Sequence, residues 1–341
     1  MPDRKGKKKE DKMRKIFIAC LGVVLLLGIV SRGYVVRAAE KYPAKPVTFI
    51  IPLEAGAGAD VISRQYCENL GAFLGKPILV VNKPGAGSSI GYREIHDAKP
   101  DGYTIGLGTI SLITNKLQGL LPYDYHDFTI LGVYATTAPI IVAATKGKQI
   151  FKTLPEVIEF AKLNPGKVKM AAGSKGQAWW IFAMDFISTA GLSFNVIPQE
   201  GAGMTSMIQV GGGHVDIGVV TLTEAKPLID AGNAQLLTIF GKNRPYAFPN
   251  TPTLEELGIK CKLLFSPTIA MGPPNMPKEI TEVLVKAVEA ANNNQEWRKK
   301  VEAGGSLRCT YIPPHQAIEE FEKIREVASE MMSKAGILKE K

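Results

Sequence analysis

Short runs of small residues, some with an acidic residue, follow several predicted strands. Their backbone N–H groups are the groups in this sequence best suited to bind an anion. Val47–Ile51 is an apolar, largely β-branched run typical of a buried strand, and Pro52 ends it. The turn Glu54–Ala59 contains two glycines, and the helical spacing of apolar residues begins after Asp60. Backbone N–H groups and the positive end of a helix dipole would meet at this turn and bind an anionic group without a basic side chain. A tight turn that binds no ligand is the alternative.

The motifs of catalysis, nucleotide binding and zinc binding do not fit this sequence. Ser174 lacks the G-x-S-x-G pattern of a serine hydrolase, because Ala172 occupies the first glycine position. Gly85, Gly87 and Gly91 do not have the spacing of a dinucleotide-binding loop. The cysteines and histidines do not have zinc-site spacing. We therefore predict that the protein is not an enzyme and uses no cofactor or metal ion. Disulfide formation is left open for the three cysteines of the body, Cys67, Cys261 and Cys309.

Strands alternate with helices along the first third of the chain, which predicts a parallel sheet with helices on both faces. The expected strands are 47–51, 78–81 and 104–107, and glycine with serine, threonine or aspartate follows each of them. Ligands bind at the carboxyl ends of the strands in open parallel sheets, so these turns are expected to share one binding edge. A second α/β unit follows, and the extended runs 128–145 and 263–271 are long enough to leave the first unit and return.

The positive charge of the chain is concentrated near its beginning. The 341 residues carry a formal net charge of +9, and residues 1–38 contain ten basic and three acidic side chains. The remaining residues therefore carry a formal charge of only +2. A nearly neutral body does not provide the electrostatic surface that a polyphosphate requires, so we predict no nucleic-acid partner.

The basic segment has the pattern of an export signal. The apolar run 16–30 follows it, and Val36–Ala38 is a suitable cleavage site. We predict cleavage after residue 38. The alternative is a signal that is not cleaved and instead anchors the protein in a membrane through residues 16–36. Translation could start at Met1 or at Met13, and the sequence does not decide between them.

A series of short motifs follows the chain in a defined order. They include P-x-x-x-G-x-x-x-D, N-x-P-G-A-G-x-x-x-G, P-D-G-Y-T, N-P-G-K, G-S-x-G, G-G-x-V-D and F-P-N-T-P-T-L-E-E-L-G. Each motif alone is weak, but the whole series in register is specific. From about Tyr42 to Gly336 the chain resembles the tripartite tricarboxylate transporter substrate-binding family, also called Bug receptors.

The resemblance implies an α/β architecture, the type II periplasmic binding protein fold, in which two α/β domains are joined by two crossing strands. We expect a signal peptide at 1–38, domain 1 at 39–137 and 266–341, and domain 2 at 138–265. The resemblance also implies a periplasmic or otherwise extracytoplasmic solute-binding receptor that acts as a monomer. Such a receptor captures a small organic carboxylate between its domains and delivers it to the permease subunits of a tripartite transporter. The alternatives are an exported ligand sensor and an enzyme that acts on a small carboxylate.

The positions of this sequence that match the motifs of the family place the ligand-binding loops at the turns that follow the predicted strands. Asp60 has a second explanation, because it could also be the N-cap of the first helix. The predicted ligand-binding residues are Glu54, Gly56, Ala57, Asp60, Gly87, Ser88, Ser89, Thr109, Ser111, Ser174, Gln177, Ala178, Trp179, Gln199, Glu200 and Gly201.

Three residues depart from the pattern of the family and bear on the ligand. Glu54 and Glu200 stand where the family usually offers neutral or basic groups, so they would disfavour a ligand with several negative charges. Trp179 would provide a flat apolar wall that also attracts a cation. We expect a ligand with one carboxylate on an aromatic, amide or amino-bearing molecule rather than citrate. The alternative is that both glutamates face solvent and Trp179 packs in the core. The groups expected to hold the carboxylate are the N–H groups of Gly56, Ala57 and Ser88 and the hydroxyls of Thr109 and Ser174.

Overall fold

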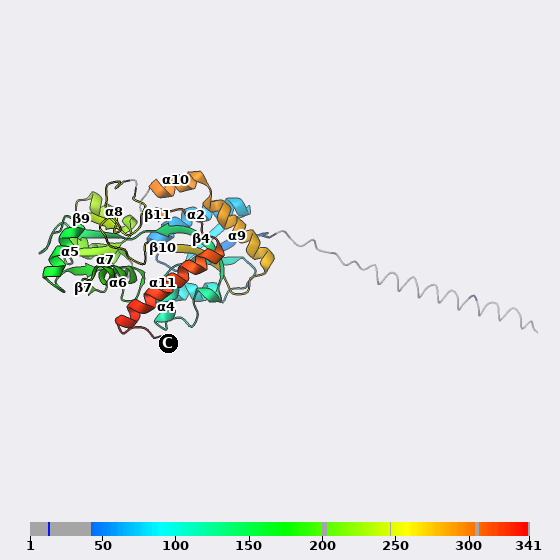
Figure 1. Ribbon diagram of the computed structural model, residues 1–341. Helices are drawn as coiled ribbons and strands as arrows, with labels where there is room; N and C mark the ends of the chain where they lie inside the picture. Colours follow the sequence, from blue (N-terminus) through cyan, green and yellow to red (C-terminus); the bar gives the residue numbers. More distant parts are fainter. Residues whose placement is uncertain (1–12, 14–41, 200–202, 246, 304–306, 340–341) are drawn as a thin grey trace, which may run out of the picture. The chain divides into compact units, whose positions relative to one another are not determined.

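The computed structural model describes Met13 and residues 42–339, apart from 200–202, 246 and 304–306 (Figure 1). Residues 42–341 form one compact unit, which contains both sheets. The predicted signal segment, except for Met13, lies outside the described residues. Within the described part of the chain, no helix combines the length and the apolar character that crossing a membrane requires.

A mixed six-stranded sheet forms the centre of what we call lobe 1. Its strands lie in the order β11-β4-β10-β3-β1-β2. Strands β1, β2 and β3 are parallel, as predicted. Strand β10 runs antiparallel to β3 and β4, because it enters the sheet from the opposite direction after the chain has passed through the second lobe. Strand β11 also runs antiparallel to its neighbour, β4. The strands are β1 (Val47–Ile51), β2 (Ile78–Asn82), β3 (Thr104–Gly108), β4 (Thr129–Thr137), β10 (Ser266–Gly272) and β11 (Leu307–Arg308).

A five-stranded sheet forms the centre of lobe 2. Its strands lie in the order β7-β6-β8-β5-β9, with β6 parallel to both β7 and β8 and β5 antiparallel to both β8 and β9. The strands are β5 (Ile140–Ala144), β6 (Lys169–Ala171), β7 (Asn195–Ile197), β8 (Ile217–Val220) and β9 (Ala234–Ile239).

Helices cover both faces of each sheet. The α-helices are α2 (Gly58–Leu74), α3 (Ser89–His96), α4 (Ser111–Leu117), α5 (Leu154–Leu163), α6 (Ala178–Ala190), α7 (Gly203–Gly212), α8 (Leu222–Asp230), α9 (Lys278–Asn292), α10 (Gln295–Ala303) and α11 (Pro314–Lys334). Two short 3₁₀ turns are η1 (Ala86–Ser88) and η2 (Tyr125–Asp127).

Strand β1 shows why both faces need helices. Successive side chains of a strand point to opposite faces of the sheet. Val47, Phe49 and Ile51 therefore join the core beneath α2, α9 and α10, whereas Ile50 joins the core beneath α3, α4 and α11. All four side chains are buried, which is the pattern of a strand covered on both sides.

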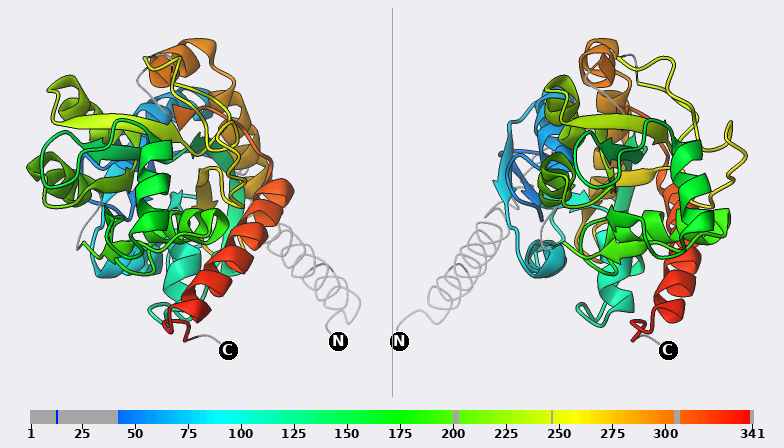
Figure 2. Two further views of the ribbon diagram at one scale, coloured as in Figure 1. Left: turned by 60° about the vertical axis from the view of Figure 1, so that its left-hand side comes forward. Right: turned by 90° about the vertical axis from the view of Figure 1, so that its left-hand side faces the viewer.

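The chain passes between the lobes twice, as the resemblance implied. The first passage is at Ala138-Pro139, between β4 and β5, and the second joins β9 to β10. The two passages lie side by side, because the ideal Cβ position of Gly241 is 2.9 Å from the Cβ of Ala138. Helix α11 packs against β4 and α4 of lobe 1 and also against α6 of lobe 2 (Figures 1 and 2). The result is a two-domain α/β fold in which the turns after the parallel strands of both sheets face a common space.

Candidate functional site

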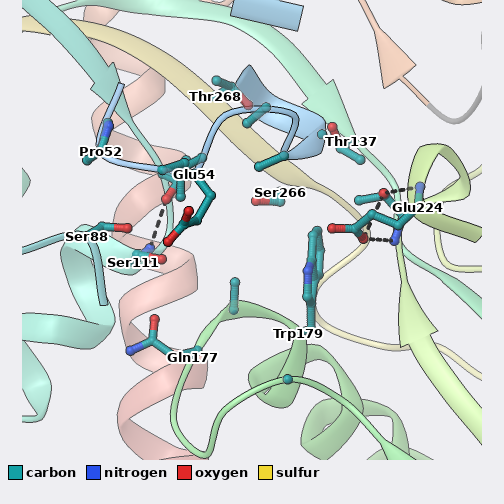
Figure 3. A pocket seen from close by; sticks show the side chains of 18 of the residues that line it. Pro52, Glu54, Ser88, Ser111, Thr137, Gln177, Trp179, Glu224, Ser266 and Thr268 are labelled. Carbon is teal, nitrogen blue, oxygen red and sulfur yellow. Dashed lines mark hydrogen bonds between the residues drawn. The ribbon is translucent and has the colours of Figure 1, made fainter. Parts of the chain in front are cut away.

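A cavity of about 350 Å³ lies between the lobes, at the carboxyl ends of their parallel strands (Figure 3). Lobe 1 contributes the turns after β1, β2 and β3, lobe 2 contributes the turns after β6 and β8, and the strands that adjoin the passages, β4 and β10, contribute three hydroxyl side chains. The lining residues are Pro52, Leu53, Glu54, Ala57, Gly58, Ala59, Ile62, Pro84, Gly85, Gly87, Ser88, Thr109, Ser111, Thr137, Gly173, Ser174, Gln177, Ala178, Trp179, Thr221, Thr223, Glu224, Ser266 and Thr268.

The first turns of two helices, one from each lobe, lie at the cavity. Gly58 and Ala59 begin α2, Ala178 and Trp179 begin α6, and all four residues line the cavity. The N–H groups of the first turn have no partner inside their helix, and they give the helix end about half a positive charge. The ideal Cβ position of Gly58 is only 3.6 Å from Oγ1 of Thr221 in the opposite lobe. Two positive helix ends therefore meet at one cavity.

The N–H groups that we expected to hold a carboxylate are already used inside the turns. Gly56 N–H donates to Asp60 Oδ2 at 2.8 Å, and Ala57 N–H donates to the carbonyl of Glu54 at 3.2 Å. Ser88 N–H donates to a carbonyl of its own loop at 3.0 Å. That expectation was wrong, because tight turns consume their own amides. Among the described lining residues, the groups that remain for an anion include the amides at the starts of α2 and α6.

The two hydroxyls expected beside those amides differ in their availability. The Ser174 hydroxyl donates to the carbonyl of Gln199 at 2.8 Å, so its proton is not directed at the cavity. Thr109 Oγ1 accepts a hydrogen bond from Ser111 N–H at 3.2 Å and lies 3.1 Å from the hydroxyl oxygen of Tyr92. When Tyr92 donates, Thr109 keeps its own proton for a ligand.

Two carboxylates border the cavity, and none of its described lining residues is a lysine, an arginine or a histidine. Glu54 and Glu224 approach from opposite sides, with Trp179 beside Glu224 (Figure 3). The N–H and the hydroxyl of Thr221 both donate to Glu224 Oε2 at 2.9 Å in the capping box of α8. Burial raises the pKa of the Glu224 carboxyl above its ordinary value, although hydrogen bonds from Thr221 and Gly203 oppose the rise.

The adjacent tryptophans have different environments. Trp179 is partly buried and lines the cavity, whereas Trp180 is 4% exposed and belongs to the main core cluster. Neighbouring positions on a helix point about 100° apart, so one of the two rings faces the ligand space and the other packs inside lobe 2. Both Trp179 and Glu54 line the cavity, but Trp179 also packs against the main core cluster and the Glu54 side chain is exposed, while Glu200 lies outside the described residues.

Side chains bridge the lobes at the border of the cavity. Asn115 of α4 accepts a hydrogen bond from the side chain of Gln177 at 3.3 Å, and its own amide donates to the carbonyl of Gly87 at 2.7 Å. The side-chain amide of Gln118 donates to the carbonyl of Gly176 at 3.1 Å. Asn115 is completely buried, so these contacts fix α4 against the turn that begins α6.

The glycine-rich turn after β2 has an unusual backbone. Residues 85–88 all have positive φ angles, including the non-glycine residues Ala86 (47°) and Ser88 (81°). Side chains rarely adopt such angles, and a strained turn of this kind persists only where its surroundings hold it in place. Here Asn115 holds the carbonyl of Gly87, which directs the turn toward the cavity.

Asp60 lies beneath the cavity wall rather than in it, and it does not cap the helix. Helix α2 begins at Gly58, three residues earlier than an Asp60 cap requires, and its N-cap, Ala57, makes no side-chain capping bond. The buried Asp60 carboxylate instead accepts hydrogen bonds from Gly56 N–H and Asn82 Nδ2, both at 2.8 Å, and from Arg64 Nε at 3.1 Å. Burial alone would raise the pKa of Asp60, but these hydrogen bonds outweigh it and lower the pKa.

We expect Asp60→Ala to lower the free energy of unfolding by about 2 kcal/mol at neutral pH, because it removes hydrogen bonds to a charged acceptor. A lowered pKa means that the stabilisation is present above the unfolded-state pKa of about 4 and is lost as the pH falls through the lower folded-state pKa. Urea unfolding at neutral and acidic pH measures the difference. A deficit of the variant that stays constant into the acidic range would contradict this role for Asp60.

The structure brings together ten of the sixteen predicted ligand-binding residues. The residues at the cavity are Glu54, Ala57, Gly87, Ser88, Thr109, Ser111, Ser174, Gln177, Ala178 and Trp179. Four others are described but do not line it: Gly56 and Asp60 close the first turn, Ser89 bonds to Asn115, and Gln199 holds Ser174. Glu200 and Gly201 lie outside the described residues.

Sequence reasoning missed two groups of lining residues. Thr221, Thr223 and Glu224 follow β8, and the rule that located the other turns applies there, as does the T-x-x-E capping pattern. Thr137, Ser266 and Thr268 belong to the strands that adjoin the passages between lobes. Nothing in their local sequence marks these three, because only the pairing of β4 with β10 directs them to the cavity.

Among the described residues, no group of three or more histidine, cysteine, aspartate and glutamate side chains is placed to hold a metal ion. Cys67, Cys261 and Cys309 are free and buried, and burial raises the pKa of each thiol above its ordinary value. Buried thiols of this kind are inert packing groups.

Known proteins are similar to this chain in both sequence and fold. Residues 62–324 match the tripartite tricarboxylate transporter family receptor, TctC. Protein BugT of Bordetella pertussis is 27% identical over 302 residues, which cover 87% of this chain and 89% of BugT. A solved periplasmic transporter is 26% identical with a TM-score of 0.74, and the match covers 87% of this chain and 99% of that one. R. palustris Rpa4515, solved with adipate, is 22% identical with a TM-score of 0.77 and the same coverage.

These matches agree with the order of motifs and with the two-lobed α/β fold. The family is one of solute-binding receptors, and the match to it covers most of this chain. The chain therefore belongs to the tripartite tricarboxylate transporter receptor family, the family of Bug receptors that its motifs resemble.

Proposed function

We propose that the protein is an extracytoplasmic receptor that captures a small organic carboxylate between its lobes and delivers it to a tripartite membrane permease. The observation that carries the proposal is the meeting of two helix N-termini, from α2 and α6, at one cavity between the lobes. Helix N-termini bind anions through free N–H groups and the dipole, so no basic side chain is required. Serine and threonine hydroxyls around the cavity supply further donors.

Membership of the receptor family supports this function. The similarity of this fold to that of a protein solved with adipate also supports it. The cavity of about 350 Å³ is of the size that small-molecule sites have. We assign residues 39–137 and 266–341 to one domain and 138–265 to the other, which places the boundary at the two passages between the sheets. Closure of these domains around the solute, by a monomer, would present it to the permease.

Native mass spectrometry of freshly purified protein tests the proposal. We expect a retained mass that corresponds to a small carboxylic acid, released on denaturation and chemically unchanged after incubation with the protein. Conversion of that acid into another compound would favour the alternative of an enzyme. Uptake of the same labelled acid by cells should stop when the gene is deleted, and unimpaired uptake would favour a sensor.

We expect the mature protein to start at Ala39 and to lie outside the cytoplasm. The reason is that residues 1–38 combine a basic start, an apolar run and a cleavage site. N-terminal sequencing of the native protein, together with cell fractionation, measures both. A membrane-bound protein that still begins at Met1 or Met13 would instead support an anchor through residues 16–36.

A further inference from the structure

We propose that the solute carries a protonated amino group in addition to its carboxylate, and that this amino group binds between Glu224 and Trp179. The inference rests on the proposed receptor function and specifies the class of solute. It follows from three features of the cavity: the carboxylate of Glu224, the indole of Trp179 and the second carboxylate, Glu54, on the opposite side (Figure 3).

Glu224 is held in place as an acceptor. Its Oε2 atom accepts from the N–H and the hydroxyl of Thr221, both at 2.9 Å, and a backbone hydrogen bond comes from Gly203. An alanine at position 203 would place its Cβ 2.2 Å from Oε2, so the glycine is required for this close approach. A carboxylate that is fixed, partly buried and without a basic partner among the lining residues is stabilised by a cation from the ligand.

Trp179 provides the second half of a cation site. Its ring lines the cavity next to Glu224 in Figure 3, and it lies at the start of α6, where its backbone N–H also belongs to the first helical turn. An ammonium group over an indole face is attracted by the ring quadrupole. The same ligand would thus place its carboxylate at the helix N-termini and its ammonium against the indole and Glu224.

The cavity is also poorly suited to a second carboxylate. A dicarboxylate would bring two negative charges between the partly buried Glu224 and the exposed Glu54, and the described lining residues offer no basic side chain to compensate them. The amides of α2 and α6 can stabilise one carboxylate, but like charges in a confined site oppose each other. An amino-carboxylate has no net charge and meets groups of the opposite sign at both of its ends.

Three matched ligands test this inference on the full mature protein. Adipate, δ-aminovalerate and caproate share one carboxylate and the same chain of methylenes, and they end in a carboxylate, an ammonium and a methyl group. Shorter and longer sets of the same three classes cover other chain lengths. We expect titration calorimetry to show that the best amino-carboxylate binds about 10-fold or more tightly than the matched diacid and monoacid.

Glu224→Gln is the central variant, because glutamine keeps the capping box while the charge is removed. We expect the affinity for the amino-carboxylate to fall about 30-fold, the affinity for the diacid to rise, and the affinity for the monoacid to rise less than that for the diacid. Glu54→Gln should also raise the affinity for the diacid. Asp230→Asn is the matched control, since it removes one negative charge from the exposed side of the same helix and should change none of the three affinities.

The possible results separate the two proposals. If a diacid binds best, or if Glu224→Gln leaves the order of the three classes unchanged, the amino-group site is overturned while the receptor function stands. If none of the three carboxylate classes, at any chain length, binds more tightly than plain alkyl amines, the carboxylate receptor itself is overturned. Both proposals are supported if the wild-type protein binds amino-carboxylates most tightly, monoacids less tightly and diacids least tightly, and if the two glutamine variants exchange the places of amino-carboxylates and diacids in this order of affinity.

Discussion

Replacing Ala178 by aspartate is expected to weaken carboxylate binding by about 100-fold or more while the protein stays folded. Ala178 is the first residue of α6 and lines the cavity, so the new carboxylate would occupy the place that the ligand's carboxylate needs. Like charges brought together in a binding site cost several kcal/mol. The same aspartate is favourable for the helix, because a negative charge near a helix N-terminus stabilises it by about 0.3–1 kcal/mol.

The two effects have opposite signs, and this makes the experiment decisive. Calorimetry should show lost binding, while thermal unfolding should give a melting temperature that is unchanged or raised. Ala178→Asn is the control of equal size, and we expect it to weaken binding far less because it adds no charge. Equal losses for the two variants would show that space, and not the positive helix end, decides binding at this position.

Replacing Gly91 by alanine is expected to lower the free energy of unfolding by about 3 kcal/mol, because the site has no space for a methyl group. An alanine Cβ would lie 2.6 Å from Pro52 Cβ, 2.7 Å from Pro52 Cα and 2.8 Å from the carbonyl oxygen of Lys83. Two of these three atoms belong to the backbone, so no side chain can rotate away. Helix α3 would have to move from the loop that carries Pro52, and that loop forms part of the cavity wall.

Urea unfolding of Gly91→Ala measures the loss, and calorimetry should also show weaker binding because the β1–α2 turn shifts. Glu94→Ala on the same helix is the control. It removes a surface ion pair with Lys83, so we expect a change within about 0.5 kcal/mol. If Gly91→Ala is as stable as this control, the close packing of α3 against Pro52 is not what holds the turn.

The location of the candidate cavity could be predicted from the sequence, because it depends on local patterns. The strands 47–51, 78–82 and 104–108 were expected within one residue of their bounds, and the turns after them were expected to bind the ligand. The carboxyl ends of parallel strands lie at one edge of a sheet, so no long-range information was needed to place Ser88 near Thr109.

The identity of the binding groups could not be predicted as well, because hydrogen bonds depend on exact geometry. The amides of Gly56 and Ala57 seemed available from their position in a small-residue turn, but the turn closes through them. Asp60 seemed suited to the cavity or to a helix cap, and the structure places it beneath the wall as an acceptor for three partners. The spacing of residues along the chain contains none of this information.

Glu224 illustrates a second reason why the site could not be predicted fully from the sequence, which is that remote parts of the chain meet there. Its capping-box position is visible in the sequence, but its place across a cavity from Glu54 results from the packing of two lobes that are distant in the chain. The same holds for Thr137 and Ser266, which reach the cavity only because β4 pairs with β10 at the boundary between the lobes. Contacts between remote segments were the part that required the structure.

Small-angle scattering of the mature protein with and without its best carboxylate tests the central claim, that two lobes close on a solute. A solute at about 100 times its dissociation constant should add about 2.7 kcal/mol to the free energy of unfolding, which confirms saturation. Under that condition we expect the radius of gyration of the wild-type protein to decrease, and that of Ala178→Asp to stay constant. Saturating binding to the wild-type protein with an unchanged scattering profile would contradict the account.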